Sequence, residues 1–409
     1  MTGGGIFQLH AKGEQNTHLC GNATTSYFHS VYRKRINFSK ESIELCFKGR
    51  GDFGQRITIE LGDYGDLVHN CGIQVTLPEV PYVSEAAWVD QIGHMIIKEA
   101  SIEIGGRCID KHYGAWMSIW NELTLSFEQE VGYNNITGNT SDLVGTSLQM
   151  IQTINPIPSK TIFIPLQFWF NRNASLALPL ISLQSDESPK IIIEFEQISN
   201  LVRGDPTNVT NLHLSNVKFY ADYIYLSQDE RKWFAKNSFE ILIDQLQFIE
   251  TTKQGPTHAI QLNEMNHPLI ELIWTVRDQD YEVATDITKS YINFKDANGE
   301  NPVKSAVLRV NNIERFQERD GYYFNKIQPL QHHSRSPHDC GICVYSFAEK
   351  PESSNEYTGS LNATNIDNIV LNLSLTDSAS SKNNRIMVFA RNYNLLVFKG
   401  GFGRLRYTI

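Results

Sequence analysis

Apolar and polar residues alternate along most of this chain, and this period of two constrains its fold more than any other feature. The alternation is clearest at residues 369–375, where Ile369, Leu371, Leu373 and Leu375 fall on one face of an extended segment. Successive side chains of a strand point to opposite faces, so the pattern indicates strands with one face on a core. Comparable runs occupy residues 57–61, 191–196 and 240–246. We therefore expect antiparallel sheets, which commonly bury one face only.

Helical periodicity is confined to three short segments. The longest is Tyr113–Glu130, in which large apolar residues recur at helical spacing: Trp116, Ile119, Trp120 and Leu123. A second helix is predicted after Ser227, which can cap the first amides while Glu230 bonds back to it, and Asn237 ends this helix. A third helical signal covers Ser84–Asp90.

The segments between these elements are rich in turn-forming residues. Clusters of Gly, Asp, Asn and Pro stand at 49–52, 204–206 and 296–299, and Glu128–Lys160 is predicted to be a long loop because it is rich in Gly, Asn and Thr. Asn, Ser, Thr and Gly are plentiful in the whole chain, and such a composition favours β structure with many turns. The fold class predicted from the residues is all-β.

The length and a faint internal repeat both predict two domains. The chain has 409 residues, more than the roughly 250–300 that one hydrophobic core usually supports. Residues 57–67 resemble 258–268, residues 100–106 resemble 306–312, and Ile191 corresponds to Ile369, in the same order in both halves. The repeat predicts two copies of one β-sandwich, each with its own core, joined near Ser227–Asn237.

Charge and targeting signals exclude several function classes. The net charge is −9, and the short basic run Tyr32–Arg35 is typical of a solvated strand edge, so we expect no direct nucleic-acid binding. The N-terminus lacks the pattern of a signal peptide, and no apolar run approaches the roughly 20 residues of a membrane span. The six cysteines are too sparse for a disulfide framework, which fits a reducing cytosol.

The C-terminus is predicted to hold two adjacent strands. Ile386–Ala390 and Asn394–Phe398 both have β patterns, and Arg391–Tyr393 between them is predicted to be a turn. The last of these strands is expected to lie inside a sheet of the second sandwich, so its removal would strip ladder hydrogen bonds from a neighbour and uncover core side chains.

A series of motifs resembles a known family. Gln328–His333 and Gly341–Phe347 resemble the QP-x-QHH…GI-x-VYSF signature of the major capsid proteins of nucleocytoplasmic large DNA viruses. Further segments that resemble the family follow in its order: 3–9, 19–22, 101–106, 109–110, 113–116, 119–124, 165–171, 178–180, 231–235, 266–269, 272–274 and 400–403. The resemblance covers nearly the full chain. Residues 334–340 and the basic Arg404–Tyr407 depart from the family pattern.

This resemblance implies a double jelly roll: two consecutive eight-stranded antiparallel jelly rolls with a few short helices in loops and linker. The predicted parts are an N-terminal arm (1–25), a first jelly roll (26–226), a linker helix (227–238) and a second jelly roll (239–409). The family implies a homotrimer that forms a pseudo-hexagonal capsomer and tiles an icosahedral shell. Its implied partners are neighbouring capsomers and minor capsid, cement and penton proteins. The family also implies that the protein is located in the virion, which is assembled in the host cytoplasm.

The resemblance implies no enzymatic activity, and we assign no catalytic, cofactor-binding or metal-binding residues. Two alternatives stay open. The chain could be a minor double-jelly-roll capsid paralogue, which copy number per virion would decide, or a carbohydrate-binding or hydrolytic jelly-roll protein, which sugar affinity would decide.

A cluster of histidines and cysteines could suggest a zinc site. Thiolate and imidazole are preferred zinc ligands, and the cluster comprises His332, His333, His338, Cys340 and Cys343. However, a single Cys-x-x-Cys lacks a second ligand pair, and a strand through Cys343 would place the two cysteines on opposite faces. We instead expect His332 and His333 to satisfy buried carbonyls or to meet a neighbouring subunit.

Enzymatic motifs are poorly supported. Glu194 and Glu196 could suggest a glycosidase pair, because residues two apart on a strand share a face, roughly 7 Å apart. Carboxylates that alternate with apolar residues are more typical of a solvated strand face. The chain has no Gly-x-x-x-x-Gly-Lys-Ser/Thr run, so no nucleotide site of that type is predicted.

Overall fold

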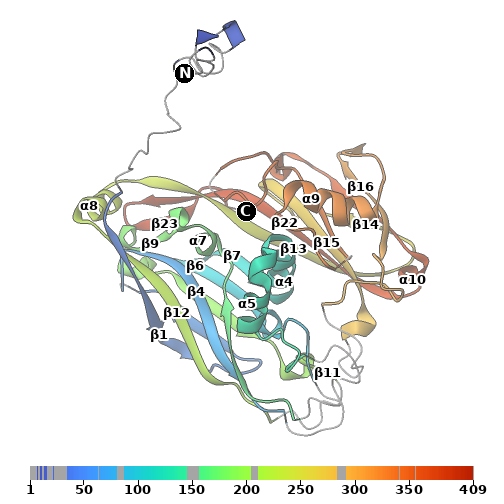
Figure 1. Cartoon of the computed structure of the whole chain (residues 1–409), viewed down its shortest axis with the longest axis horizontal. Coiled ribbons are helices and arrows are strands. Elements are labelled where there is room, and N and C mark those ends of the chain that lie inside the picture. Colours follow the sequence, from blue (N-terminus) through green and yellow to red (C-terminus); the bar gives the residue numbers. More distant parts are fainter. Residues whose placement is uncertain are drawn as a thin grey trace. The chain divides into compact units, whose positions relative to one another are not determined.

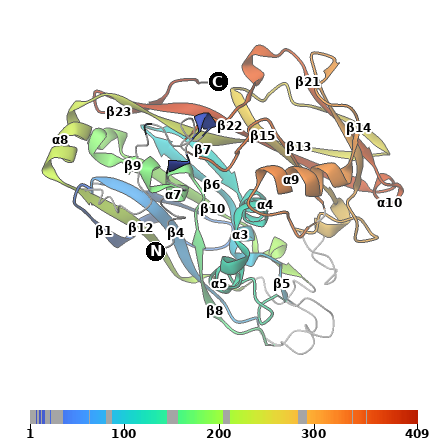
Figure 2. The ribbon, with the colours of Figure 1, turned by 45° about the horizontal axis from the view of Figure 1, so that its top comes forward.

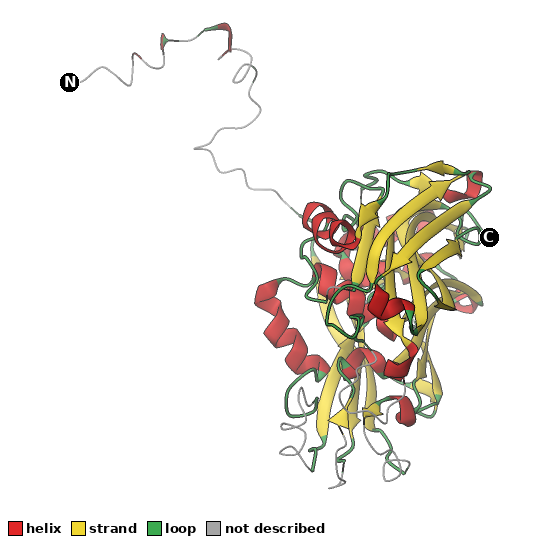
Figure 3. Ribbon diagram, turned by 90° about the vertical axis from the view of Figure 1, so that its right-hand side faces the viewer, coloured by secondary structure: helices red, strands yellow, loops and turns green. Residues whose placement is uncertain are grey.

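The computed structural model describes residues 35–408 except 63, 81–86, 145–155, 204–210, 283–291, 340 and 355, together with isolated positions before residue 35. The predicted arm, residues 1–25, therefore lies mostly outside the described residues. The chain divides into two units, Met1–Asn37 and the compact unit Phe38–Ile409. Strands are the predominant regular structure of the compact unit, and its helices are short (Figure 3).

The first half of this unit contains two antiparallel sheets (Figure 1). One sheet has the order β1–β12–β4–β8, with β9 on β4, and the other has the order β2–β3–β10–β6–β7. Their bounds are β1 Phe38–Leu45, β2 Phe47–Gly49, β3 Arg56–Glu60, β4 Leu67–Leu77, β6 Ile97–Ile104, β7 Arg107–Tyr113, β8 Lys160–Pro165, β9 Leu178–Pro179, β10 Lys190–Phe195 and β12 Ser215–Leu226. A two-stranded pair, β5 (Ala87–Trp88) with β11 (Val202–Arg203), lies outside these sheets.

The second half repeats this architecture. One sheet has the order β13–β22–β15–β19, with β20 on β15 and β23 on β22, and the other has the order β14–β21–β16–β17, with β18 on β16. Their bounds are β13 Phe239–Gln254, β14 Thr257–Gln261, β15 Pro268–Asp278, β16 Val303–Val310, β17 Ile313–Glu314, β18 Arg319–Asp320, β19 Ile342–Ser346, β20 Leu361–Asn362, β21 Ile369–Leu375, β22 Asn383–Lys399 and β23 Phe402–Leu405.

The segments that the sequence repeat matched occupy equivalent places in the two halves. The order β3–β10–β6 of the first half corresponds to β14–β21–β16 of the second, and β1–β12–β4–β8 corresponds to β13–β22–β15–β19. Each half is therefore a jelly roll, and the predicted double jelly roll is confirmed. We call the strands up to β12 the first roll and those from β13 onwards the second roll.

The alternation read from the sequence matches the burial of β21. Ile369, Leu371, Leu373 and Leu375 are all at most 3% exposed and belong to the apolar cluster of the second roll. The residues between them are partly exposed. The predicted face of this strand is confirmed.

One hairpin turn is repeated in both rolls. Gly105 and Gly106 join β6 to β7 with φ of 56° and 73°, and Asn311 and Asn312 join β16 to β17 with φ of 48° and 65°. Positive φ at both central residues matches the right-handed twist of hairpin strands, and Gly and Asn adopt it most readily. Gly105–Gly106 and Asn311–Asn312 therefore form the same type of turn with different residues.

Short helices lie in the connections between strands. Their bounds are α3 Ile92–Met95, α4 Gly114–Thr124, α5 Phe127–Thr137, α7 Trp169–Arg172, α8 Gln228–Lys236, α9 Gln328–His332 and α10 Asp377–Ser380, with a π-helical turn η7 Tyr323–Ile327 that continues into α9. Single 3-10 turns are η1 Ala174–Leu176, η2 Leu180–Ser182, η3 Ser185–Glu187, η4 Ile198–Asn200, η6 Gln279–Glu282 and η8 Ala363–Asn365. No helix among the described residues is both long and apolar enough to cross a membrane.

Several helix predictions need correction. The helix predicted over Tyr113–Glu130 is two helices, because Leu125 is extended (φ −71°, ψ 125°) and ends α4. As a result, the predicted loop Glu128–Lys160 begins inside α5. The described part of Ser84–Asp90 contains strand β5 rather than a helix.

The linker helix α8 forms where it was predicted, but its cap differs. Ser227 is its N-cap residue and Asn237 its C-cap residue, as expected. The Ser227 side chain makes no capping hydrogen bond, so the predicted capping box is wrong.

The predicted turn at Arg391–Tyr393 is also wrong. β22 runs without a break from Asn383 to Lys399 and pairs with β13 from Asn383 to Phe398. Its two halves pack in different hydrophobic cores. Val388 and Ala390 pack in the second roll, whereas Leu396 and Phe398 pack in the apolar cluster of the first roll. β22 therefore links the two rolls.

Candidate functional site

Charged side chains are buried where the two rolls meet. Arg391 of β22, Asp244 of β13, Glu271 of β15 and His333 at the end of α9 are each less than 9% exposed. Arg172 of α7 reaches them from the first roll. Because isolated charges are costly to bury, their pairing decides whether this region can form at all.

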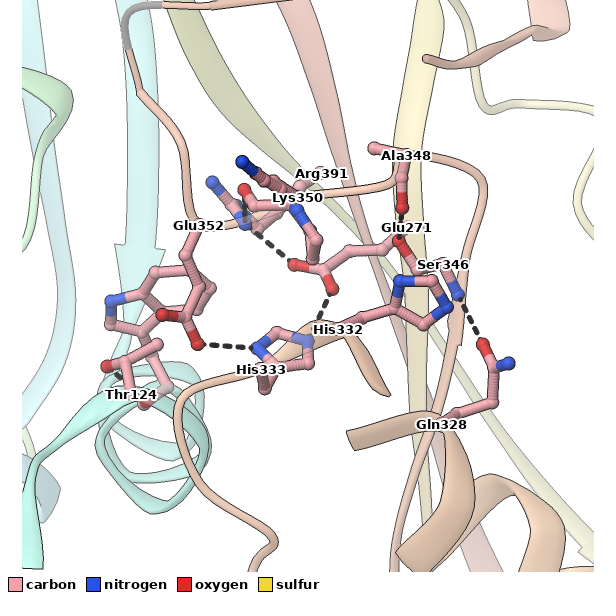
Figure 4. A network of polar contacts seen from close by, with 12 residues as sticks. Thr124, Glu271, Gln328, His332, His333, Ser346, Ala348, Lys350, Glu352 and Arg391 are labelled. Carbon is pink, nitrogen blue, oxygen red and sulfur yellow. Dashed lines mark hydrogen bonds and ion pairs between the residues drawn. The ribbon is translucent and has the colours of Figure 1, made fainter. Parts of the chain in front are cut away.

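The charges are joined in one chain of contacts, and Figure 4 shows the part of it that runs from Arg391 through Glu271 and His333 to Glu352. Asp244 Oδ2 accepts hydrogen bonds from Arg172 Nη2 at 2.6 Å and from Arg391 Nη2 at 3.0 Å. Arg391 Nη1 donates to Glu271 Oε1 at 2.7 Å, and Glu271 Oε2 lies 2.8 Å from His333 Nε2. Three potential cations (two arginines and a histidine) thus face the carboxylates.

A third carboxylate completes this network. Glu352 Oε1 lies 3.0 Å from His333 Nδ1 and accepts the Ser334 amide at 2.7 Å. The Ser334 hydroxyl donates to the other oxygen of Glu352. With His333 protonated, the three cations balance the three carboxylates, and we call these six charged residues with Ser334 the junction network.

An aromatic ring from the first roll covers the network. The Trp120 ring of α4 lies 4.2 Å from the Arg391 guanidinium carbon and 5.1 Å from that of Arg172. The same ring is nearly perpendicular to the His333 ring, at an interplanar angle of 82° and with ring centroids 6.3 Å apart. A desolvated guanidinium over an indole face is attracted by the negative face of the ring. Trp120 therefore shields the charges from solvent and also binds them.

The two acids keep their charge despite burial. Burial alone raises the pKa of Asp244, but the guanidiniums of Arg172 and Arg391 reverse this and hold it well below its usual range. Burial likewise raises the pKa of Glu271, and His333 and Arg391 bring it down to about 2. Both carboxylates are therefore ionised at neutral pH.

The histidine is shifted in the opposite direction. Burial alone lowers the pKa of His333, but the carboxylates of Glu271 and Glu352 raise it to about 9. His333 is therefore an imidazolium at neutral pH, and both ring nitrogens act as donors. In this state it bridges two elements as a fixed cation.

An apolar layer surrounds the charged centre. Four residues of α4 are buried against the outer face of the second roll: Trp116, Ile119, Trp120 and Leu123. They contact Ile273, Val344, Met387 and Phe389 from β15, β19 and β22. Figure 2 shows α4 between the strands of the two rolls. The helical spacing predicted for α4 is thus explained by a partner in the other roll.

Hydrogen bonds and an ion pair tie the two rolls at the margins of the junction. Leu246 N of β13 donates to Asp110 Oδ1 at 3.0 Å, and Gln245 donates to the Ile109 carbonyl of β7. On the other side, Arg335 N donates to the Leu123 carbonyl, and its guanidinium pairs with Glu130 of α5, both at 3.0 Å. The segment after the QHH motif therefore returns to the first roll.

The structure does not bring the possible zinc ligands together. His333 lies in the junction network, whereas His338 is exposed and 3.8 Å from Glu130. Cys343 is buried in the second roll beside Asn301, and Cys340 lies outside the described residues. Among the residues that the structure describes, no cluster of His, Cys, Asp and Glu is placed to hold a metal ion.

The two histidines of the motif have different partners. His332 Nδ1 lies 3.1 Å from the Glu349 carbonyl, which fits the predicted contact with a carbonyl. His333 instead contacts two carboxylates, so the expectation of a carbonyl partner is wrong for it. The reason is that β15 and the 349–354 loop place Glu271 and Glu352 on either side of the ring.

The carboxylates considered for catalysis have separate partners. Glu194 pairs with Lys98 Nζ at 2.5 Å. Glu196 lies beyond the end of β10 and accepts from the Gln197 amide and the Asn200 side chain. These contacts agree with a solvated strand face rather than with a pair that shares a substrate.

Sequence reasoning missed most of the junction network. Asp244, Glu271 and Arg391 each interrupt a long apolar run, at 241–246, 269–276 and 386–398. Single acids in two such runs and a base in a third are a signal of buried pairing, since unpaired charges there would be too costly. Nothing in the sequence shows which acid meets which base.

Comparisons with known proteins agree with this architecture. Residues 26–227 match a family model described as major capsid protein N-terminus, and residues 230–404 match one described as large eukaryotic DNA virus major capsid protein. The chain is 39% identical to the major capsid protein of Pyramimonas orientalis virus, covering 99% of this chain and 100% of that protein. It is 34% identical to the major capsid protein of Phaeocystis pouchetii virus, covering 99% of each chain.

Solved structures show the same fold. The chain matches the protein in the quasi-atomic model of the PBCV-1 virus capsid with a TM-score of 0.79 and 27% identity, covering 94% of this chain and 100% of that one. The Faustovirus major capsid protein matches with a TM-score of 0.76 at 12% identity, covering 95% of this chain and 94% of that one, which is evidence for the fold alone.

Proposed function

The chain belongs to the family of major capsid proteins of large eukaryotic DNA viruses, and from this premise we propose that three copies associate into a pseudo-hexagonal capsomer. The protein is a structural component of the virion, in its capsid shell. Its proposed partners are two further copies, neighbouring capsomers, and minor capsid, cement and penton proteins. We further propose that it assembles in the host cytoplasm and acts without enzymatic activity.

The observation that carries this proposal is the pairing of two equivalent rolls through a buried junction. Arg391 of the second roll is tied to Arg172 of the first through one oxygen of Asp244. Because each chain supplies two similar rolls in a fixed orientation, three chains supply six positions around a threefold axis. The junction network would keep the two rolls of each chain at a constant angle in such a ring. We propose 26–226 and 239–409 as the bounds of the rolls and 227–238 as the linker.

The oligomeric mass tests this proposal directly. At micromolar concentration the purified chain should give about 140 kDa by light scattering, three times its mass of 46.6 kDa. Electron micrographs of the same sample should show particles of six-sided outline. A stable folded monomer at that concentration would contradict the proposal. Sugar affinity is an independent measurement that would instead support a carbohydrate-binding protein.

A further inference from the structure

The strand registers show which residues of the two rolls are equivalent. In the second roll, Ile273 of β15 pairs with Phe389 on one side and Val344 on the other. In the first roll, Gly72 of β4 pairs in the same way with Tyr220 and Pro165. Gly72 therefore occupies the place of Ile273 on the outer face of the first roll.

These equivalent faces differ in what lies on them. On the second roll, the outer face around Ile273 is covered by α4 of the first roll. On the first roll, the outer face around Gly72 has a cavity of about 390 Å³. The residues lining this cavity include Ser42, Asn70, Phe163, Pro165, Tyr220 and Asp222. We call it the Gly72 hollow.

The residue types at the hollow explain its shape. A side chain at Gly72 would meet the Phe163 ring, since a Cβ there would lie 2.4 Å from Phe163 Cζ. Where the second roll has the aliphatic Ile273, the first roll thus has the Phe163 ring lying against the backbone of Gly72, and the rings of Phe163 and Tyr220 line the hollow. The hollow can accept an apolar side chain from another element.

The second roll has a helix in the position that α4 has in the first. α4 lies between β7 and β8, and the helical segment η7–α9 lies between β18 and β19, which are the equivalent connections. Unlike α4, this segment exposes large apolar residues: Tyr322 is 66% exposed, Ile327 37% and Leu330 76%. Ile327 and Leu330 are three residues apart and therefore neighbours on the helix surface.

We propose that Ile327 and Leu330 of one copy pack into the Gly72 hollow of a neighbouring copy. This inference rests on the proposed trimer and identifies the surfaces that form it. Within one chain, the helix of the first roll covers the second roll; between chains, the helix of the second roll covers the first roll of the next copy. The contact joins two different surfaces, so it closes into a ring when three copies are related by a threefold rotation.

The composition of the two contacts suits their different roles. The α4 contact is buried in every chain and is lined by aliphatic and aromatic residues. The hollow mixes aromatic rings with three polar residues: Ser42 and Asn70 are exposed in the single chain, and Asp222 is half-buried. A surface that is exposed to solvent before assembly and buried after it has to combine polar and apolar residues, because a wholly apolar exposed patch promotes nonspecific association.

Replacing Leu330 tests the contact. Leu330→Asp should raise the concentration at which the trimer dissociates by about 30-fold for each contact, as for a buried anchor residue at an interface. Its far-UV circular dichroism should match that of the parent, because the side chain is exposed in the single chain and its replacement leaves the fold of the chain unchanged. The matched control is Phe127→Asp on α5, since Phe127 is 79% exposed but lies outside the proposed contact.

A cross-link gives a second, independent readout. Ser42 lines the hollow and is exposed, so the double variant Ser42→Cys with Leu330→Cys should form disulfides between copies under mild oxidation. Because the contact is head-to-tail, a non-reducing gel should show a species of three linked chains, absent from either single variant. A parent protein that is monomeric would contradict the trimer itself. A trimer that tolerates Leu330→Asp, or that forms no such cross-link, would contradict this contact alone.

Discussion

Arg391 and Glu271 lie directly opposite each other on the neighbouring strands β22 and β15, and their side chains meet at 2.7 Å. The pair is at most 2% exposed and lies at the centre of the junction network. A buried ion pair contributes little stability compared with apolar residues of the same volume, but breaking it leaves a charge without its partner. The junction is therefore sensitive to the loss of any one member.

Arg391→Met should destabilise the protein by about 3–5 kcal/mol, because Asp244 and Glu271 would each lose a guanidinium in a buried site. Equilibrium denaturation in urea measures this change. Arg406→Met is the matched control: Arg406 pairs with Glu240 at the surface, where both side chains are at least 40% exposed, and exposed pairs contribute about 1 kcal/mol or less. Equal losses in both variants would contradict the role of the junction.

Stability should fall as the pH rises through about 9, the pKa to which Glu271 and Glu352 raise His333. The folded-state pKa lies above the ordinary value of 6.5, so the contribution of His333 is fully present below about pH 6.5 and is lost as the pH passes about 9. The total loss is on the order of 3 kcal/mol. Unfolding midpoints between pH 6.5 and 9.5 measure it.

The His333→Gln variant is the control for this pH dependence. It should be less stable than the parent at pH 7, and its stability should change less between pH 6.5 and 9.5, because it lacks the group that titrates. The same alkaline slope in both proteins would show that another group is responsible.

Trp120→Ala should cost about 3–5 kcal/mol, the usual range for truncating a large buried aromatic residue. Trp120 is 4% exposed and packs on both arginines of the junction. Trp233→Ala on α8 is the matched control, because Trp233 is 49% exposed and should change stability by less than about 1 kcal/mol. A neutral Trp120→Ala would mean that the rolls are held together without α4.

Truncation after Ala390 should give insoluble protein that forms no trimer. It removes Arg391 and the half of β22 that carries Leu396 and Phe398, two residues at most 1% exposed in the core of the first roll. Losses of roughly 2–5 kcal/mol for each large core residue rival the ~5–15 kcal/mol net stability of a domain. Removal of Met1–Gly5 is the control and should leave trimers intact, as size-exclusion chromatography would show. A soluble trimer from the C-terminal truncation would contradict this role of β22.

Local sequence patterns predicted the elements that depend only on residues close together in the chain. The alternation at 369–375 predicted both β21 and its buried face. The resemblance of residues 100–106 to 306–312 matched two hairpins that share positive φ at their turns. Such features depend on residues within a few positions of each other, so a single sequence carries them. The same holds for the apolar stripe of α4, although not for the surface that it covers.

Only the tertiary structure shows that Arg391 lies in a strand and not in a turn. A charged residue and two asparagines near it are typical of a turn, and on local grounds a turn was the better prediction. β22 remains a strand there because Glu271 and Asp244, 120 and 147 positions earlier in the chain, supply the charges that make burial of Arg391 possible. Local patterns thus indicated many of the strands, the repeat and the family, while the junction depended on partners that only folding brings together. Local patterns carry no information on such partners, because the energy of a buried charge depends on what surrounds it in space.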